Sequence, residues 1–196
     1  MSLQIRNFRV SSELWKEFLT KYHRKASERL RELIEADLKM GEEITKVNRN
    51  DIETLKKFIF STDNPIQLIG KVGIGKTTAI KKLIQNDPSH VFIVFDCHDE
   101  YDFLPEVQTI TTDLKQSCRI RMPKQVSASK GLFPVYHNQI LSQKYPENYV
   151  VVVEEAHRYP QVKELLKEAR KFVKVIAICQ ESIGNFCPKI EIIPFY

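Results

Sequence analysis

The chain has 196 residues, of which 42% are hydrophobic, and a formal net charge of +5 at pH 7. This length allows one ordinary domain with a small appendage, and the apolar fraction is that of a globular protein. No run of about 18 apolar residues is present and no apolar stretch follows the first basic residues, so we expect no membrane span, no ordinary secretory signal and a cytoplasmic protein. Acids and bases alternate along most of the chain, so the positive charge alone does not identify a nucleic-acid partner. The four cysteines form no Cys-x-x-Cys pair, which predicts free thiols and no zinc site; they are Cys97, Cys118, Cys179 and Cys187.

The first forty residues predict a short strand followed by two amphipathic helices. Ile5 to Val10 is an extended run, and apolar residues then recur at helical spacing from Leu14 to Tyr22 and from Leu30 to Leu38. So short a segment cannot bury much core alone, so we expect a second chain to complete it. We interpret residues 1–45 as a module for dimerisation or oligomerisation.

This strand-helix-helix pattern resembles the ribbon-helix-helix family, in which two chains pair their strands into a ribbon that reads the DNA major groove. The resemblance implies base contacts from Asn7 and Arg9, or from Arg6 and Gln4 in the alternative register. It also implies a contact between a DNA phosphate and the start of the second helix, at Ser27. A helical hairpin that caps the following domain or joins subunits is the alternative reading.

A polar, charged stretch at 41–50 predicts a linker, so we expect a second domain over residues 46–196, beginning with a helix at 51–60. Apolar runs then alternate with helical segments, which predicts an α/β fold with a parallel sheet covered by helices on both faces. The runs are 66–69, 91–95, 150–153 and 173–178, with a shorter run at 190–193 that we expect at an edge of the sheet.

Residues 70–77 read Gly-Lys-Val-Gly-Ile-Gly-Lys-Thr, a complete phosphate-binding loop between a predicted strand and a predicted helix. The glycines allow backbone N–H groups to turn toward a polyphosphate, and the helix that follows adds the positive end of its dipole. Lys76 would reach the β- and γ-phosphates, and Thr77 would offer its hydroxyl to magnesium. We therefore expect ATP or GTP as the ligand, bound together with Mg²⁺. Of the two nucleotides we choose ATP. The expected nucleotide contacts are Gly70, Lys71, Val72, Gly73, Ile74, Gly75, Lys76, Thr77 and Thr78.

Functional groups of a parallel sheet collect at the carboxyl ends of its strands, which here gives Asp96, the pair Glu154 and Glu155, and Cys179 with Gln180. The two glutamates follow four valines. In a nucleotide-hydrolysing fold, one carboxylate after such a strand holds the magnesium and its neighbour takes a proton from the attacking water. We assign the magnesium to Glu154 and the catalytic base to Glu155.

Three strings of residues narrow the family. They are Glu-Glu-Ala-His-Arg at 154–158, Asp96 followed by Glu-Tyr at 100–101, and a helix with Ala-Arg-Lys at 169–171 before a strand that ends in Cys-Gln at 179–180. Together with the phosphate-binding loop they resemble the HerA and FtsK branch of the P-loop ATPases, which have a RecA-like fold. Cys179 and Ala169 depart from that branch, where Thr and Gly are usual, and the barrel domain of HerA is absent.

The resemblance implies a ring, commonly hexameric, that uses ATP hydrolysis to move double-stranded DNA, here as a minimal motor of the kind that packages viral or mobile-element DNA. It implies that Gln180 senses the γ-phosphate or positions the attacking water. Such rings complete each site with an arginine from the next subunit. The candidates are Arg119, Arg121, Arg158 and Arg170, and we favour Arg170 because it lies in a matching string. Lys124, Lys130 and Lys144 are candidates for lining a DNA channel.

Two other functions stay open. Lys71 resembles the signature lysine of partition ATPases, so a segregation ATPase of the ParA-like kind fused to a DNA-binding module is one alternative, although partition ATPases carry a single Asp where this chain has two glutamates. The other is a transcriptional regulator whose N-terminal module binds an operator while the nucleotide domain acts as a switch.

Overall fold

The structure is a computed structural model, and it describes residues 12–22, 25, 29, 44–169, 172–185 and 187–194. The chain divides into two units, Met1–Lys39 and Met40–Tyr196. In the first unit, α1 (Ser12–Tyr22) forms where the apolar spacing predicts a helix, and the rings of Phe18 and Tyr22 lie 4.9 Å apart. The predicted strand at 5–10 and the second helix at 30–38 fall outside the described residues. The ribbon-helix-helix interpretation and the boundary after residue 45 therefore stay predictions.

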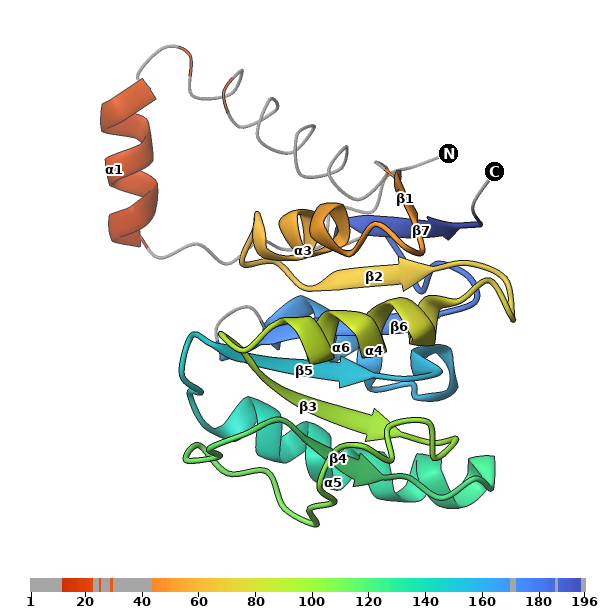
Figure 1. Cartoon of the computed structure of the whole chain (residues 1–196). Helices are drawn as coiled ribbons and strands as arrows, with labels where there is room; N and C mark the ends of the chain where they lie inside the picture. Colours follow the sequence, from red (N-terminus) through yellow and green to blue (C-terminus); the bar gives the residue numbers. More distant parts are fainter. Residues whose placement is uncertain are drawn as a thin grey trace. The chain divides into compact units, whose positions relative to one another are not determined.

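The second unit contains a seven-stranded sheet in which all described pairings are parallel (Figure 1). The strand order is β1-β7-β2-β6-β5-β3-β4. Parallel strands need a long crossover connection, and helices supply most of these connections here. Strands that follow one another along the chain are often not neighbours in the sheet. The strands are β1 (Ile44–Asn48), β2 (Ile66–Ile69), β3 (Val91–Asp96), β4 (Cys118–Arg121), β5 (Tyr149–Val153), β6 (Lys174–Cys179) and β7 (Lys189–Ile193).

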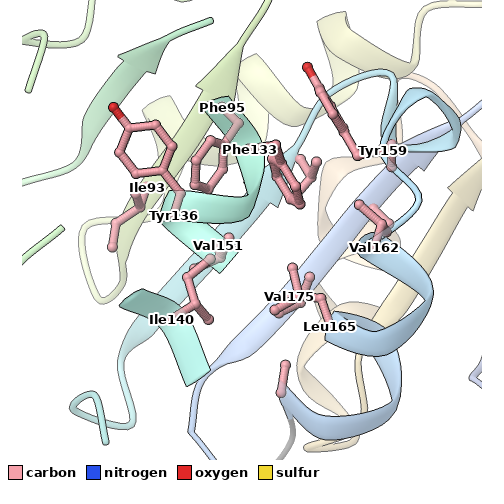
Figure 2. Close-up of a cluster of buried hydrophobic side chains, with 14 of the residues drawn as sticks. Ile93, Phe95, Phe133, Tyr136, Ile140, Val151, Tyr159, Val162, Leu165 and Val175 are labelled. Atoms are coloured by element: carbon pink, nitrogen blue, oxygen red, sulfur yellow. The ribbon is translucent and has the colours of Figure 1, made fainter. Parts of the chain in front are cut away.

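Helices cover both faces of this sheet, which confirms the predicted α/β fold class. Buried residues of α3 (Ile52–Phe60) and α4 (Lys76–Asn86) form one core with one face of the strands. Residues of α5 (Val126–Ser142) and α6 (Val162–Glu168) form a second core with the other face, and Figure 2 shows part of it. Successive residues of β5 alternate between the cores, Val150 facing the first and Val151 the second. Central strands buried on both sides read as continuous apolar runs, which is why the sequence reveals them.

Two predictions about the edges of the sheet are wrong. The stretch 41–50 was expected to be a linker, but residues 44–48 form edge strand β1, which pairs with β7. Only Val47 of β1 is buried, so the apolar signal of this strand is weak. The run at 190–193 is not an edge strand, because β7 lies between β1 and β2.

All four cysteines are free, as predicted, and the structure shows that they are buried. Within the part of the chain that the structure describes, no helix is both long enough and apolar enough to cross a membrane.

Candidate active site

The phosphate-binding loop joins β2 to α4, and its backbone conformation depends on glycine at two positions. Gly70 has φ +148°, and a Cβ there would lie 3.1 Å from Ile74 Cγ2 and 3.3 Å from the carbonyl oxygen of Ile192. Gly75 has φ +99°, and a Cβ there would lie 3.0 Å from Arg49 Cδ. L-residues with a side chain rarely adopt these angles, so the loop needs glycine for both conformation and space.

Lys76 is the first residue of α4, and its side chain is almost fully buried. Its ammonium donates hydrogen bonds to the carbonyl oxygens of Gly70, at 2.6 Å, and Lys71, at 3.0 Å. Burial lowers the pKa of Lys76, while the nearby carboxylates of Glu155 and Glu154 oppose that effect. The Lys76 ammonium therefore lies between the carbonyl oxygens of the loop and the carboxylates of Glu154 and Glu155.

Glu154 directly follows β5 and is 5% exposed. The Tyr101 hydroxyl donates a hydrogen bond of 2.5 Å to Glu154 Oε1. Burial raises the pKa of Glu154 to about 7, although the hydrogen bonds from Tyr101 and Thr77 act in the opposite direction. The Glu154 carboxylate and the Thr77 hydroxyl, assigned to magnesium from separate motifs, therefore lie together.

These two oxygen donors fit a magnesium site. Among the described residues, no group of three or more His, Cys, Asp and Glu side chains could hold a metal ion. Mg²⁺ keeps most of its waters and takes ligands from the phosphates of its nucleotide, so one or two protein oxygens suffice. The donor set favours Mg²⁺ over softer metals, because both donors are oxygens.

Glu155 has left-handed backbone angles, φ +48° and ψ +40°, and it precedes the short 3-10 helix η2 (Ala156–Arg158). A residue other than glycine in this region is unusual, and such strain occurs preferentially at functional sites. Glu155 Oε2 lies 3.2 Å from Arg158 Nη2 and 3.4 Å from His157 Nε2, in geometry that makes no hydrogen bond. Arg158 and His157 hold this buried oxygen in place, and Glu155 lines the same cavity as Lys76 and Thr77, a position suited to a general base.

A cavity of about 400 Å³ brings the two motifs together. Two of its residues, His98 and Glu100, were not named as site residues from the sequence. They lie in the loop after β3, at the same end of the sheet as the glutamates, and Glu100 contributes to raising the pKa of Glu154. The signal that could have found them is their place just beyond an apolar strand. The lining residues are Val72, Gly73, Gly75, Lys76, Thr77, Thr78, His98, Glu100, Glu154 and Glu155.

Asp96, the last residue of β3, fixes the loop that follows this strand. Its buried carboxylate accepts hydrogen bonds from the backbone N–H groups of His98, at 3.2 Å, Glu100, at 3.1 Å, and Tyr101, at 3.0 Å. It also accepts a hydrogen bond of 3.2 Å from Arg119 Nη1. With its oxygens committed to these four donors, Asp96 positions Glu100 and Tyr101 beside Glu154 and is not itself exposed to the cavity.

Gln180 is the first residue after β6, and β6 lies between β2 and β5. This order places Gln180 between the phosphate-binding loop and the acid pair, with its side chain exposed. The following loop is tied to the centre of β2, where the buried Gln67 side chain donates to the Gly184 carbonyl at 2.8 Å and accepts from Ile183 N–H at 2.7 Å. Cys179 is buried in the core, and burial raises the pKa of its thiol to about 12.

Three of the four candidate arginines pair with carboxylates of their own chain. Arg119 contacts Asp96, Arg121 lies 2.5 Å from Asp99 Oδ1, and Arg158 lies beside Glu155. Since a trans arginine must be available to a neighbouring subunit, these pairings disfavour Arg119 most, because it is also buried. Arg170 lies outside the described residues, as do the predicted DNA contacts Arg6, Asn7, Arg9 and Ser27.

Two of the three lysines proposed for a DNA channel lie far apart along the strands of the sheet. Lys124 lies beyond the carboxyl end of β4 and pairs with Asp99 Oδ2 at 3.2 Å. Lys144 lies before the amino end of β5 and lines a different cavity. These two lysines therefore lie at opposite ends of the sheet, and their part in a DNA channel stays a prediction.

Comparison with known proteins gives one match. A family described as AAA domain matches residues 59–184, which is more than half of the chain. The matched region runs from the end of α3, through the phosphate-binding loop and the acid pair, to the loop that Gln67 fixes. No curated protein and no solved structure matches the chain.

Proposed function

This chain belongs to the AAA domain family, and we propose that it is a DNA-dependent ATPase that translocates or packages double-stranded DNA. Membership of the family implies a P-loop ATPase, with nucleotide binding and ATP hydrolysis in general and typically with magnesium. We propose three further properties: dependence on DNA, a mechanism of the HerA and FtsK kind, and a cytoplasmic location.

The observation that carries the catalytic part is the meeting of Lys76, Thr77, Glu154 and Glu155 at one cavity. The N–H groups of the loop and of the first turn of α4 would bind the phosphates, and the Lys76 ammonium would neutralise their charge. Mg²⁺, when bound through Thr77 and Glu154, would supply further neutralisation of the phosphate oxygens. Glu155 would accept the proton of the attacking water at its carboxylate, and Gln180 would orient that water through its amide.

One feature supports the step from hydrolysis to DNA movement. The strings at 154–158, 96–101 and 175–180 resemble the HerA and FtsK branch, and each string follows or ends a strand at the carboxyl end of the sheet. A homo-oligomeric ring, with Arg170 as the arginine supplied to the neighbouring site, belongs to this proposal. The N-terminal unit would bind DNA through Arg6, Asn7 or Arg9 and Ser27, and would pair with a second copy.

The alternatives rest on other features. Lys71 is exposed in the loop, as a signature lysine acting on a neighbouring subunit must be, which keeps a partition-type ATPase open. The two glutamates at the cavity favour the motor instead. An ATP-responsive regulator would use the same nucleotide site but bind one operator without translocation.

The test is steady-state ATP hydrolysis with and without long double-stranded DNA, using the full chain and the chain from Met40, which keeps β1 intact. Lys76→Ala serves as the inactive control, because it removes the cation of the loop. DNA stimulation in both chains supports a translocase whose motor touches DNA. Stimulation only in the full chain, or none, favours the regulator or the partition ATPase.

A further inference from the structure

The order of the strands divides the site into two sides. The groups assigned to the γ-phosphate, the magnesium and the water follow β6 and β5, on one side of the phosphate-binding strand β2. On the other side of β2 lie β7 and then β1. If the γ-phosphate faces β6 and β5, as in the proposed function on which this inference rests, the nucleoside leaves the loop on the side of β7 and β1.

Arg49 occupies that side. It directly follows β1, and its side chain lies against Gly75, one residue before Lys76. A Cβ placed on Gly75 would lie 3.0 Å from Arg49 Cδ and 3.8 Å from Arg49 Nη1. The Arg49 side chain therefore lies next to Gly75 of the phosphate-binding loop, a residue that lines the cavity.

The backbone around Arg49 is fixed from two directions. Its N–H donates to the Ile193 carbonyl oxygen at 3.2 Å, which ties it to the end of β7. The neighbouring Asn50 side chain accepts a hydrogen bond of 3.0 Å from Lys82 of α4. The turn closes with a bond of 2.9 Å from Asp51 N–H to the Asn48 carbonyl, and Asp51 then caps α3. A residue placed this firmly can present its side chain at a defined point.

The charge of Arg49 is available. The residue is exposed, and among the residues that the structure describes no carboxylate forms an ion pair with it. In this it differs from Arg119, Arg121 and Arg158, each of which has an acidic partner. A guanidinium is planar and weakly hydrated, so it stacks well on the face of a base.

We infer that Arg49 binds the nucleoside end of the nucleotide, by stacking its guanidinium on the base. Arg49 would then make the affinity for a nucleoside triphosphate higher than the affinity for a polyphosphate without a nucleoside. It would take no part in the chemical step. This role is new to the site, because none of the sequence motifs includes residue 49.

The experiment compares the wild-type full chain with Arg49→Ala in titration calorimetry against two probes, Mg·ATP and Mg·tripolyphosphate. Lys46→Ala is the matched control, since Lys46 is a cation on β1 with only a loose 3.9 Å ion pair to Glu191 and, unlike Arg49, is not among the nearest neighbours of Gly75. We expect Arg49→Ala to weaken ATP binding about tenfold, as for the loss of a stacked cation, with tripolyphosphate affinity within about twofold of wild type. Lys46→Ala should change neither.

Steady-state kinetics give a second readout, in which Arg49→Ala should raise KM for ATP and leave kcat near the wild-type value. Equal ATP affinity in Arg49→Ala and wild type would overturn the inference, and so would equal weakening for both probes, which would indicate a phosphate contact. A wild-type chain that binds no ATP would overturn the proposed function itself, and this outcome is distinct from the other two.

Discussion

The amino end and the carboxyl end of the parallel sheet each carry a cavity, and the larger one lies at the amino end. This cavity, of about 510 Å³, is formed by segments that precede β2, β3, β5 and β6, whereas the cavity of about 400 Å³ is formed by residues that follow β2, β3 and β5. Volume alone would therefore select the wrong end of the molecule.

Two polar side chains of the amino-end cavity, those of Lys174 and His90, have partners within the chain. Lys174 donates hydrogen bonds to the carbonyl oxygens of Thr62, at 2.6 Å, and Asn64. The ring of His90 stacks on Phe60 with centroids 4.0 Å apart, and its Nδ1 lies 2.7 Å from Asp87 Oδ2. These groups hold the ends of the strands together and leave little unused hydrogen-bonding capacity.

The carboxyl end is built in the opposite way. Its loop depends on glycines with positive φ, Glu155 has left-handed backbone angles, and a buried oxygen of Glu155 makes no hydrogen bond. Glu154 has a pKa raised to about 7 by burial. The comparison teaches that strain and unused polar groups mark the reactive end, because a structural end satisfies its polar groups internally.

The largest expected effect separates two glutamates at opposite ends. Glu155→Gln should lower kcat by about 10²- to 10⁴-fold, because the amide cannot accept the proton, while ATP affinity stays within about threefold. Glu147→Gln, at the amino-end cavity, should leave both quantities unchanged. Single-turnover and binding measurements on both variants check this, and a Glu155→Gln enzyme with normal turnover would show that the base is another residue.

The next effect concerns the loop after β3. Asp96→Ala should destabilise the fold by about 3–5 kcal/mol, because it leaves three backbone N–H groups and the buried Arg119 without their acceptor. Asp63→Ala, an exposed carboxylate at the amino end, should change the free energy of unfolding by less than about 0.5 kcal/mol. Urea unfolding measures both, and similar losses for the two variants would contradict the role given to Asp96.

A smaller effect depends on pH and tests the amino end. Burial lowers the pKa of Lys174 from 10.5 to about 8, so between these values the unfolded chain binds more protons at this group than the folded chain. Stability therefore rises with pH through this window. Relative to Lys174→Met, the wild type should gain about 2 kcal/mol between pH 7.5 and pH 9.5. Unfolding of both proteins at the two pH values checks this, and a constant difference would mean that Lys174 titrates normally.

The smallest effect is expected at the rim of the carboxyl end. The Lys124 side chain is 70% exposed and pairs with Asp99, which Arg121 also contacts. Lys124→Ala should therefore lower the free energy of unfolding by less than about 1 kcal/mol, and by less still at high salt. Thermal unfolding at two salt concentrations measures this; a large, salt-independent loss would show that the pair supports the loop.

The sequence predicts those strands and helices whose pattern of apolar and capping residues lies within the element itself. β3, β5 and β6 appear as continuous apolar runs, β2 is apolar except for Gln67, and Asp51 precedes α3 as a helix cap. β4 was missed because its sequence, Cys-Arg-Ile-Arg, alternates with charges. Arg119 can be buried there only because Asp96 reaches it from another strand, and the sequence gives no sign of that pairing. α5 was missed because Pro134 lies inside it and its N-terminus has no side-chain cap.

The candidate site divides in the same way. The phosphate-binding loop and the acid pair are contiguous motifs, so residue type and order predict them, although what places them at one cavity is the strand order. Glu100, Tyr101 and Arg49 reach the site through loops after other strands, and their roles follow from contacts between distant parts of the chain. The Glu-Tyr string at 100–101 signals the family but not these contacts, and Arg49 lies in no motif.

The central claim is that nucleotide chemistry occurs at the carboxyl end of the sheet and not at the larger cavity opposite. The most direct test is a crystal structure of Glu155→Gln with Mg·ATP, a variant that should bind nucleotide without turning it over. We predict the triphosphate in the loop of residues 70–77, next to Thr77 and Glu154, and no nucleotide beside Phe60 and Lys174. Nucleotide in the amino-end cavity, or none at the loop at saturating Mg·ATP, would contradict the account.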